Sequence, residues 1–90
     1  MEFDKVYVAV RAEFREDGVM LPREILWEDG RRFKIERVTD IRKAAARRSG
    51  GQGDRYTVHI GGCERYLFFE RSPEFFGYRL GRWFVERYVG

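Results

Sequence analysis

The stretch DRYTVHIGGCERYLFFE, residues 54–70, decides the fold of this chain. Every second residue from Tyr56 to Ile60 is apolar, which is the period of a half-buried β-strand. Gly61-Gly62 follows, and glycine supplies the positive φ angles that a two-residue hairpin turn requires. The unbroken apolar run 66–69 is typical of a strand covered on both faces. The stretch therefore predicts an antiparallel hairpin.

The same pattern extends toward both ends of the chain. Residues 5–16 alternate and end at the turn pair Asp17-Gly18, and a second Asp-Gly pair stands at residues 29 and 30. Pro22 cannot donate to a strand ladder, so the second strand is expected to be irregular. Residues 82–88 are expected to close the sheet.

The segment after Gly30 changes its apolar phase, so a β-bulge near Glu36 or Arg37 is expected to bend a long strand there. Three consecutive alanines make residues 39–48 a competing helix. We expect a strand to about Lys43 and then a loop or a single helical turn.

These elements predict an all-β domain spanning residues 1–90. The expected architecture is a small antiparallel, strongly twisted sheet or a partly open barrel of five to six strands with one long basic loop. A flat sheet packed on a single helix is the alternative. Fifteen aromatic residues provide a core large enough for a chain of this length.

Composition limits the environment of the protein. A single cysteine excludes an intramolecular disulfide, and neither a signal-peptide segment nor a bilayer-spanning apolar run is evident. A cytoplasmic protein without membrane contact is therefore expected.

Charge is distributed unevenly along the chain. Residues 1–30 hold eight acidic and four basic side chains, net −4, whereas residues 31–55 hold three acidic and nine basic ones, net +6. A middle third this basic is suited to phosphate or to an acidic partner. The alternative is that the acidic first hairpin lies beside it and neutralises it.

The segment 42–55 is the leading candidate site. Its glycines expose backbone N–H groups between basic side chains, a combination that can bind phosphate and hence RNA or DNA. A mobile loop kept soluble by its charge is the alternative. The candidate nucleic-acid-binding residues are Arg31, Arg32, Arg42, Lys43, Arg47, Arg48 and Arg55.

A second candidate surface is aromatic. Phe75, Phe76 and Tyr78 lie in a predicted loop, where exposed rings would suit a protein partner or a homodimer, and an unpaired edge strand would serve the same purpose. Tyr56 and Tyr66 are expected to extend an aromatic platform on the sheet face. The alternative places these rings in the core or as loop anchors.

Catalysis is not expected. His59 and Cys63 are the only imidazole and the only thiol, with no third group placed to orient them, and a zinc site needs four ligands. The acidic pairs at 16–17 and 28–29 fall at hairpin tips, where water keeps them ionised. We therefore predict a non-catalytic binding domain without cofactor or metal.

The chain also carries three characteristic segments: Ile-x-Trp-x-Asp-Gly-Arg-x-Phe-x-Ile over 25–35, Arg-Tyr-x-Val over 55–58 and Gly-Arg-Trp-Phe-Val over 81–85. In this it resembles a family of small bacterial all-β proteins of unknown function. The resemblance covers most of the chain and implies a bacterial protein of this fold class. It brings no ligand or catalytic residue, and residues 73–78 are expected to be a local addition.

Overall fold

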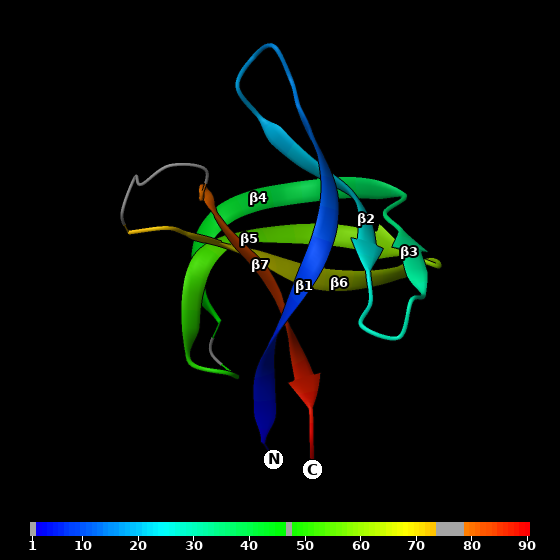
Figure 1. The fold of residues 1–90 in the computed structure, drawn as a ribbon, viewed down its shortest axis with the longest axis vertical. Helices are drawn as coiled ribbons and strands as arrows, with labels where there is room; N and C mark the ends of the chain where they lie inside the picture. The colour runs from blue at the N-terminus through cyan, green and yellow to red at the C-terminus, as the bar shows by residue number, and fades with distance from the viewer. Residues whose placement is uncertain (1, 47, 74–78) are drawn as a thin grey trace.

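The chain forms one antiparallel sheet of seven strands in a computed structural model that describes residues 2–46, 48–73 and 79–90 (Figure 1). The predicted all-β class is confirmed, although seven strands exceed the five to six expected. Across the sheet the strand order is β3-β2-β1-β7-β6-β5-β4. The strands are β1 (Phe3–Phe14), β2 (Met20–Leu26), β3 (Arg32–Lys34), β4 (Arg37–Ala46), β5 (Gly51–Ile60), β6 (Cys63–Arg71) and β7 (Gly81–Tyr88).

The sheet curls into a half-barrel because its two edge strands are consecutive in the chain. Only Ile35 and Glu36 separate β3 from β4. The Ile35 amide donates to the Arg23 carbonyl of β2 (2.9 Å), and the Glu36 amide donates to the His59 carbonyl of β5 (2.8 Å). Two residues thus connect both edges of the sheet, and the predicted partly open barrel is confirmed.

The expected bulge near Glu36 is wrong in detail. The chain breaks there into two strands at opposite edges of the sheet, and the register irregularity lies further on, between Val38 and Asp40. The helical alternative is also wrong for the described residues, because β4 continues to Ala46. Pairing with the glycine-rich start of β5 keeps the alanines extended, since tertiary contacts override a local helix preference.

The hairpin turns follow the glycines. Gly61 and Gly62 have φ of 57° and 77° and form the two-residue turn between β5 and β6, as predicted. The turn at Asp17-Gly18 is one residue longer than expected: the Arg15 amide donates to the Val19 carbonyl (2.9 Å), and Gly18 at φ 88° closes the loop. The second Asp-Gly turn has the same three-residue form.

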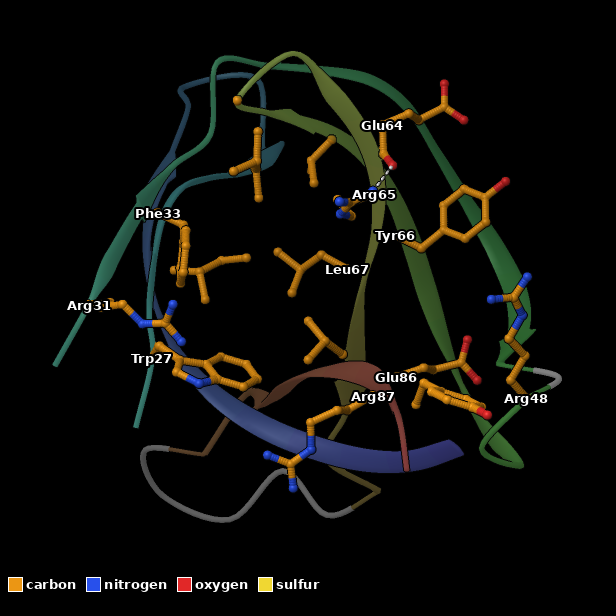
Figure 2. A pocket seen from close by; sticks show the side chains of 16 residues that line it. Trp27, Arg31, Phe33, Arg48, Glu64, Arg65, Tyr66, Leu67, Glu86 and Arg87 are labelled. Atoms are coloured by element: carbon orange, nitrogen blue, oxygen red, sulfur yellow. Dashed lines mark hydrogen bonds between the residues drawn. The ribbon is translucent and has the colours of Figure 1, made fainter. Parts of the chain in front are cut away.

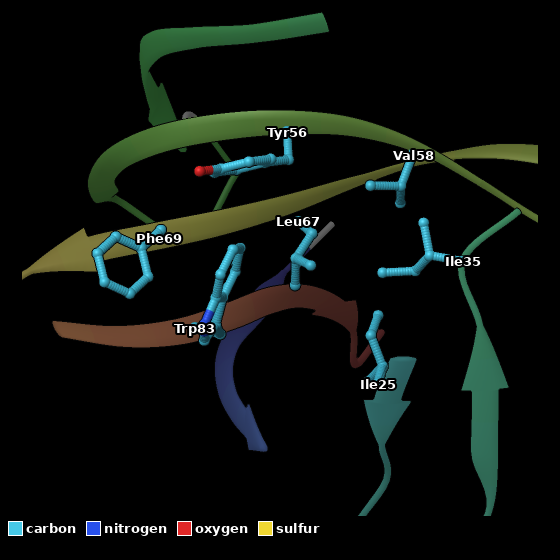
Figure 3. Packing of buried hydrophobic residues seen from close by; sticks show 7 residues of the cluster. All are labelled: Ile25, Ile35, Tyr56, Val58, Leu67, Phe69 and Trp83. Atoms are coloured by element: carbon cyan, nitrogen blue, oxygen red, sulfur yellow. The ribbon is translucent and has the colours of Figure 1, made fainter. Parts of the chain in front are cut away.

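The main core lies on the inner face of the half-barrel, the face that carries Leu67 and Trp83 (Figure 3). The Trp83 ring lies 5.0 Å from the Tyr56 ring and 4.9 Å from the Phe69 ring, centroid to centroid. Tyr56 is therefore a core residue, and its predicted place in an exposed platform is wrong. The buried cluster comprises Ile25, Ile35, Tyr56, Val58, Leu67, Phe69 and Trp83.

A second, smaller core lies on the outer face, the face that carries Phe68 and Phe84. These two rings stack at 5.0 Å with an interplanar angle of 9°, and Ala46 is buried with them. The end of the β4–β5 hairpin curls over this face: a Cβ added at Gly51 would lie 2.8 Å from Phe84 Cζ. Glycine is needed here for close approach rather than for flexibility.

The long basic loop expected over 42–55 is therefore absent. Residues 42–46 and 51–55 belong to β4 and β5, which pair from Arg42 and Arg55 to Ala46 and Gly51. The turn between them is attached to the sheet, because the Ser49 amide donates to the Glu86 carboxylate (2.6 Å). The sequence pattern predicts a loop because glycines that allow close packing, such as Gly51 and Gly53, look the same in a sequence as flexible ones.

Candidate nucleic-acid interface

The candidate site lies where the neighbouring strands β6 and β7 separate, which leaves a split in the sheet. These strands pair only from Phe68–Arg71 to Gly81–Phe84. The first half of β6 continues beside β5, whereas the second half of β7 continues beside β1. A groove of about 910 Å³ lies at this split (Figure 2).

The floor of the groove is apolar. Leu67 from β6 and Val58 from β5 border it but are themselves fully buried, whereas Val85 from β7 is partly exposed. The aromatic side chains of Trp27 and Phe33 flank this floor and come from the β2–β3 hairpin (Figure 2). Trp27, Phe33 and Val85 are partly exposed, so they provide the accessible apolar surface of the groove.

The rim of the groove is basic and aromatic. Arg65 extends from β6, Arg87 from β7, Arg31 from the turn before β3, and Arg48 from the β4–β5 turn (Figure 2). Tyr66 lies on the β6 side with 47% of its surface exposed, so the expectation that it lies on an accessible sheet face is confirmed.

Salt bridges neutralise only part of this charge. Arg31 Nε lies 2.6 Å from Asp29 Oδ2, and Arg87 Nη1 lies 3.3 Å from Glu28 Oε1. In the described part of the chain, no carboxylate lies within 4 Å of the guanidinium groups of Arg48 or Arg65.

Arg55 extends the basic rim onto the outer face. Its guanidinium carbon lies 4.5 Å from the Tyr66 ring centroid, and its Nε is buried without a hydrogen-bond partner among the described residues. Arg42 stands opposite Arg55 in the β4–β5 ladder. It is neutralised by its own neighbour, because Arg42 Nε lies 2.6 Å from Asp40 Oδ2.

Lys43 and Arg32, which were also predicted, do not join this surface. Lys43 follows Arg42 in β4 and so points to the other face, where it borders a second hollow. Arg32 is exposed in the short edge strand β3. Arg47 and the predicted aromatic interface of Phe75, Phe76 and Tyr78 lie outside the described residues.

The second hollow is lined by charges that compensate one another. Lys5 Nζ lies 2.9 Å from Glu70 Oε1, and the Tyr7 hydroxyl donates to Glu70 Oε2 (2.8 Å). The hydrogen bond from Lys5 holds the pKa of Glu70 below its ordinary value, and the same bond raises the pKa of Lys5. Arg71 pairs with Asp54 in the same way (2.8 Å). Paired charges attract an external ion only weakly, so this hollow is the weaker candidate.

The possible Cys-His pair is divided between the two faces of the sheet. Cys63 is paired with Ile60, one residue beyond His59, so the thiol and the imidazole project to opposite faces. His59 Nε2 instead lies 4.0 Å from Glu64 Oε2. The described residues contain no group of three or more His, Cys, Asp or Glu side chains placed to hold a metal ion, and no helix long and apolar enough to span a membrane.

Sequence reasoning missed Arg65, Arg87 and Trp27. Each looks like an ordinary solvated or core position within its strand or turn, and no local spacing distinguishes it. They line one groove only because β6 and β7 diverge. The point of divergence is set by the pairing of β6 with β5 and of β7 with β1.

Comparisons of the chain with models of protein families, with curated proteins and with solved structures found no match. The resemblance to small bacterial all-β proteins therefore stays a sequence-based prediction.

Proposed function

We propose that this protein is a non-catalytic domain that binds nucleic acid weakly and largely without sequence preference. The observation that carries the proposal is the contact of Arg55 with the exposed ring of Tyr66, beside a groove whose lining includes Arg48 and Arg65. None of these three guanidinium groups is paired with a carboxylate among the described residues. Unpaired arginines beside an exposed aromatic ring suit phosphates and bases together.

The strength of this contact follows from the number of free charges. Three phosphate contacts on a single strand give a slope of about −2 in log affinity against log salt, since each contact contributes about −0.7. Raising salt from ~50 to ~200 mM should then weaken binding about twentyfold. The dissociation constant at physiological salt is expected in the range of about 10⁻⁴ to 10⁻⁶ M, typical of non-specific binding.

The test compares two triple variants that remove the same charge. One carries Arg48→Ala, Arg55→Ala and Arg65→Ala at the groove. The other carries Arg11→Ala, Arg15→Ala and Arg23→Ala in the β1–β2 hairpin, where each arginine already pairs with an acidic side chain. Titration of labelled oligonucleotides should show binding lost in the first variant and nearly retained in the second. Equal loss in both would show that net charge alone attracts the ligand, and no binding by the wild type would overturn the proposal.

A protein partner is the second candidate, and the exposed edges of the sheet favour it. β4 is a ten-residue edge strand whose outer side pairs with no other described strand. Such an edge can receive a strand from a partner or from a second copy of this chain. Sedimentation equilibrium tests the homodimer directly: a monomer mass at tens of micromolar protein would exclude it.

A further inference from the structure

We propose that the groove between β6 and β7 receives unpaired bases, so that the ligand is a single strand rather than a duplex. This inference rests on the proposed function, because it assumes that the arginines of the rim contact phosphate.

The composition of the groove floor supports this inference. A site for phosphate alone needs only basic groups and backbone amides, whereas the lining of this groove also includes the partly exposed apolar side chains of Trp27, Phe33 and Val85. Nucleobases have flat apolar faces and polar edges, which match an apolar floor inside a polar rim. A volume of about 910 Å³ is that of a cleft that holds a molecule with several rings.

The arrangement of charge supports the same occupant. Arg65 lies on the β6 side of the floor and Arg87 on the β7 side, with Arg48 at the end toward the β4–β5 turn (Figure 2). A single strand can place its phosphate backbone along one of these two sides of the groove while its bases turn toward the apolar lining. In a duplex the bases are paired and stacked inside the helix, so they cannot reach the floor without leaving the stack.

Tyr66 provides a stacking surface at the edge of the groove. Arg55 lies 4.5 Å from its ring centroid, and the side chain still exposes 47% of its surface. A base can therefore stack on the ring while a neighbouring phosphate meets Arg55. Removing such a ring weakens single-strand binding by about fivefold to a hundredfold per stacked base.

The experiment uses oligo-dT and a duplex of the same length as probes and reads tryptophan fluorescence. The chain has two tryptophans: Trp27 lines the groove, whereas Trp83 is buried in the core. Oligo-dT should bind at least tenfold more tightly than the duplex and should quench the fluorescence. The Trp27→Phe variant should bind oligo-dT but lose the quenching, because its remaining tryptophan does not meet the ligand.

Tyr66→Ala should lower the affinity for oligo-dT at least fivefold, and Tyr66→Phe should keep it, because stacking needs the ring and not the hydroxyl. Phe14→Ala is the matched control: Phe14 exposes 64% of its surface on the β1–β2 hairpin, and its removal should change nothing. Equal affinity for duplex and oligo-dT, with both lost in the Arg48, Arg55 and Arg65 variant, would overturn this inference and leave the proposed function standing. No binding of either probe would overturn both.

Discussion

At the scale of single residues, some charged side chains already have a partner of opposite charge within the protein, and others have none among the described residues. Glu70 accepts hydrogen bonds from Lys5 and Tyr7, and the Arg82 guanidinium carbon lies 3.3 Å from the Tyr7 ring centroid. Arg65, in contrast, donates to the backbone carbonyl of Glu64 at 3.3 Å and to no other group among the described residues. Local pairing, and not the number of arginines, therefore identifies which side chains are available to a ligand.

The Glu70 cluster predicts a pH dependence of stability. The pKa of Glu70 is lowered, so its contribution is present above the ordinary value of 4.5 and is lost as the pH falls through the folded value. The pKa of Lys5 is raised above 10.5, so its contribution is present below 10.5 and is lost as the pH rises through the folded value. Glu70→Gln should therefore lower the free energy of unfolding by about 0.2–1 kcal/mol at pH 7, a range typical of exposed pairs.

Urea unfolding of wild type and Glu70→Gln at pH 7 and at pH 3 measures this effect. The difference between the two proteins should shrink at pH 3, because this contribution decreases once the pH falls below the ordinary pKa of 4.5. Glu16→Gln removes an exposed carboxylate with no salt bridge among the described residues and should show no difference at either pH. A loss from Glu70→Gln that is the same at both pH values would contradict the assignment.

At the scale of elements, the β4–β5 hairpin makes the largest difference between expectation and structure. Its alternating residues predicted the strands, and those predictions are confirmed for residues 54–60. Its alanines and glycines indicated a loop, and that interpretation is wrong for residues 42–46 and 51–55, because they pair as strands and because Ala46 and Gly51 pack with Phe84. A glycine selected for close approach cannot be distinguished from a flexible one until its neighbour is known.

The substitution Phe84→Leu tests whether contact with the Phe84 ring holds the end of the β4–β5 hairpin on the sheet. The smaller side chain leaves the Phe68 ring and Gly51 without their partner, and the protein should lose about 1–3 kcal/mol of stability. Amide exchange should accelerate about tenfold or more over residues 48–53, because the hairpin end then opens locally. Hydrogen exchange read by mass spectrometry checks this, with Phe14→Leu as control. Acceleration spread evenly over all strands would indicate global destabilisation instead.

At the scale of the whole molecule, the two ends of the chain and the two edges of the sheet are each held together. The Glu2 amide donates to the Gly90 carbonyl (3.1 Å), and the Val89 amide donates to the Glu2 carbonyl (3.0 Å), so the termini lie side by side (Figure 1). Ile35 and Glu36 join the edges at the other connection. The terminal hydrogen bonds extend the ladder between β1 and β7, whereas those of Ile35 and Glu36 close the half-barrel between its two edges.

This closure predicts opposite outcomes for two circular permutants with the same short linker between residues 90 and 1. New ends at Asp17-Gly18, an exposed turn, should leave cooperative unfolding within about 1–2 kcal/mol of the wild type. New ends between Ile35 and Glu36 should cost more, because the cut falls where both edges of the sheet are attached and where Ile35 is buried. Thermal and urea unfolding of both permutants measures the difference; equal stability would show that the connection does not hold the barrel closed.

The sequence by itself determined the class of the protein, because alternation of apolar residues and glycine turns are local properties that each strand carries alone. It also determined Arg31, Arg48 and Arg55 as candidates, because their charge is evident without a structure. Only the tertiary structure decided that Arg31 and Arg48 line one groove with Arg65, and that Arg55 lies over the ring of Tyr66. The groove depends on the point where β6 and β7 stop pairing, and this point is set by hydrogen bonds between residues far apart in the chain.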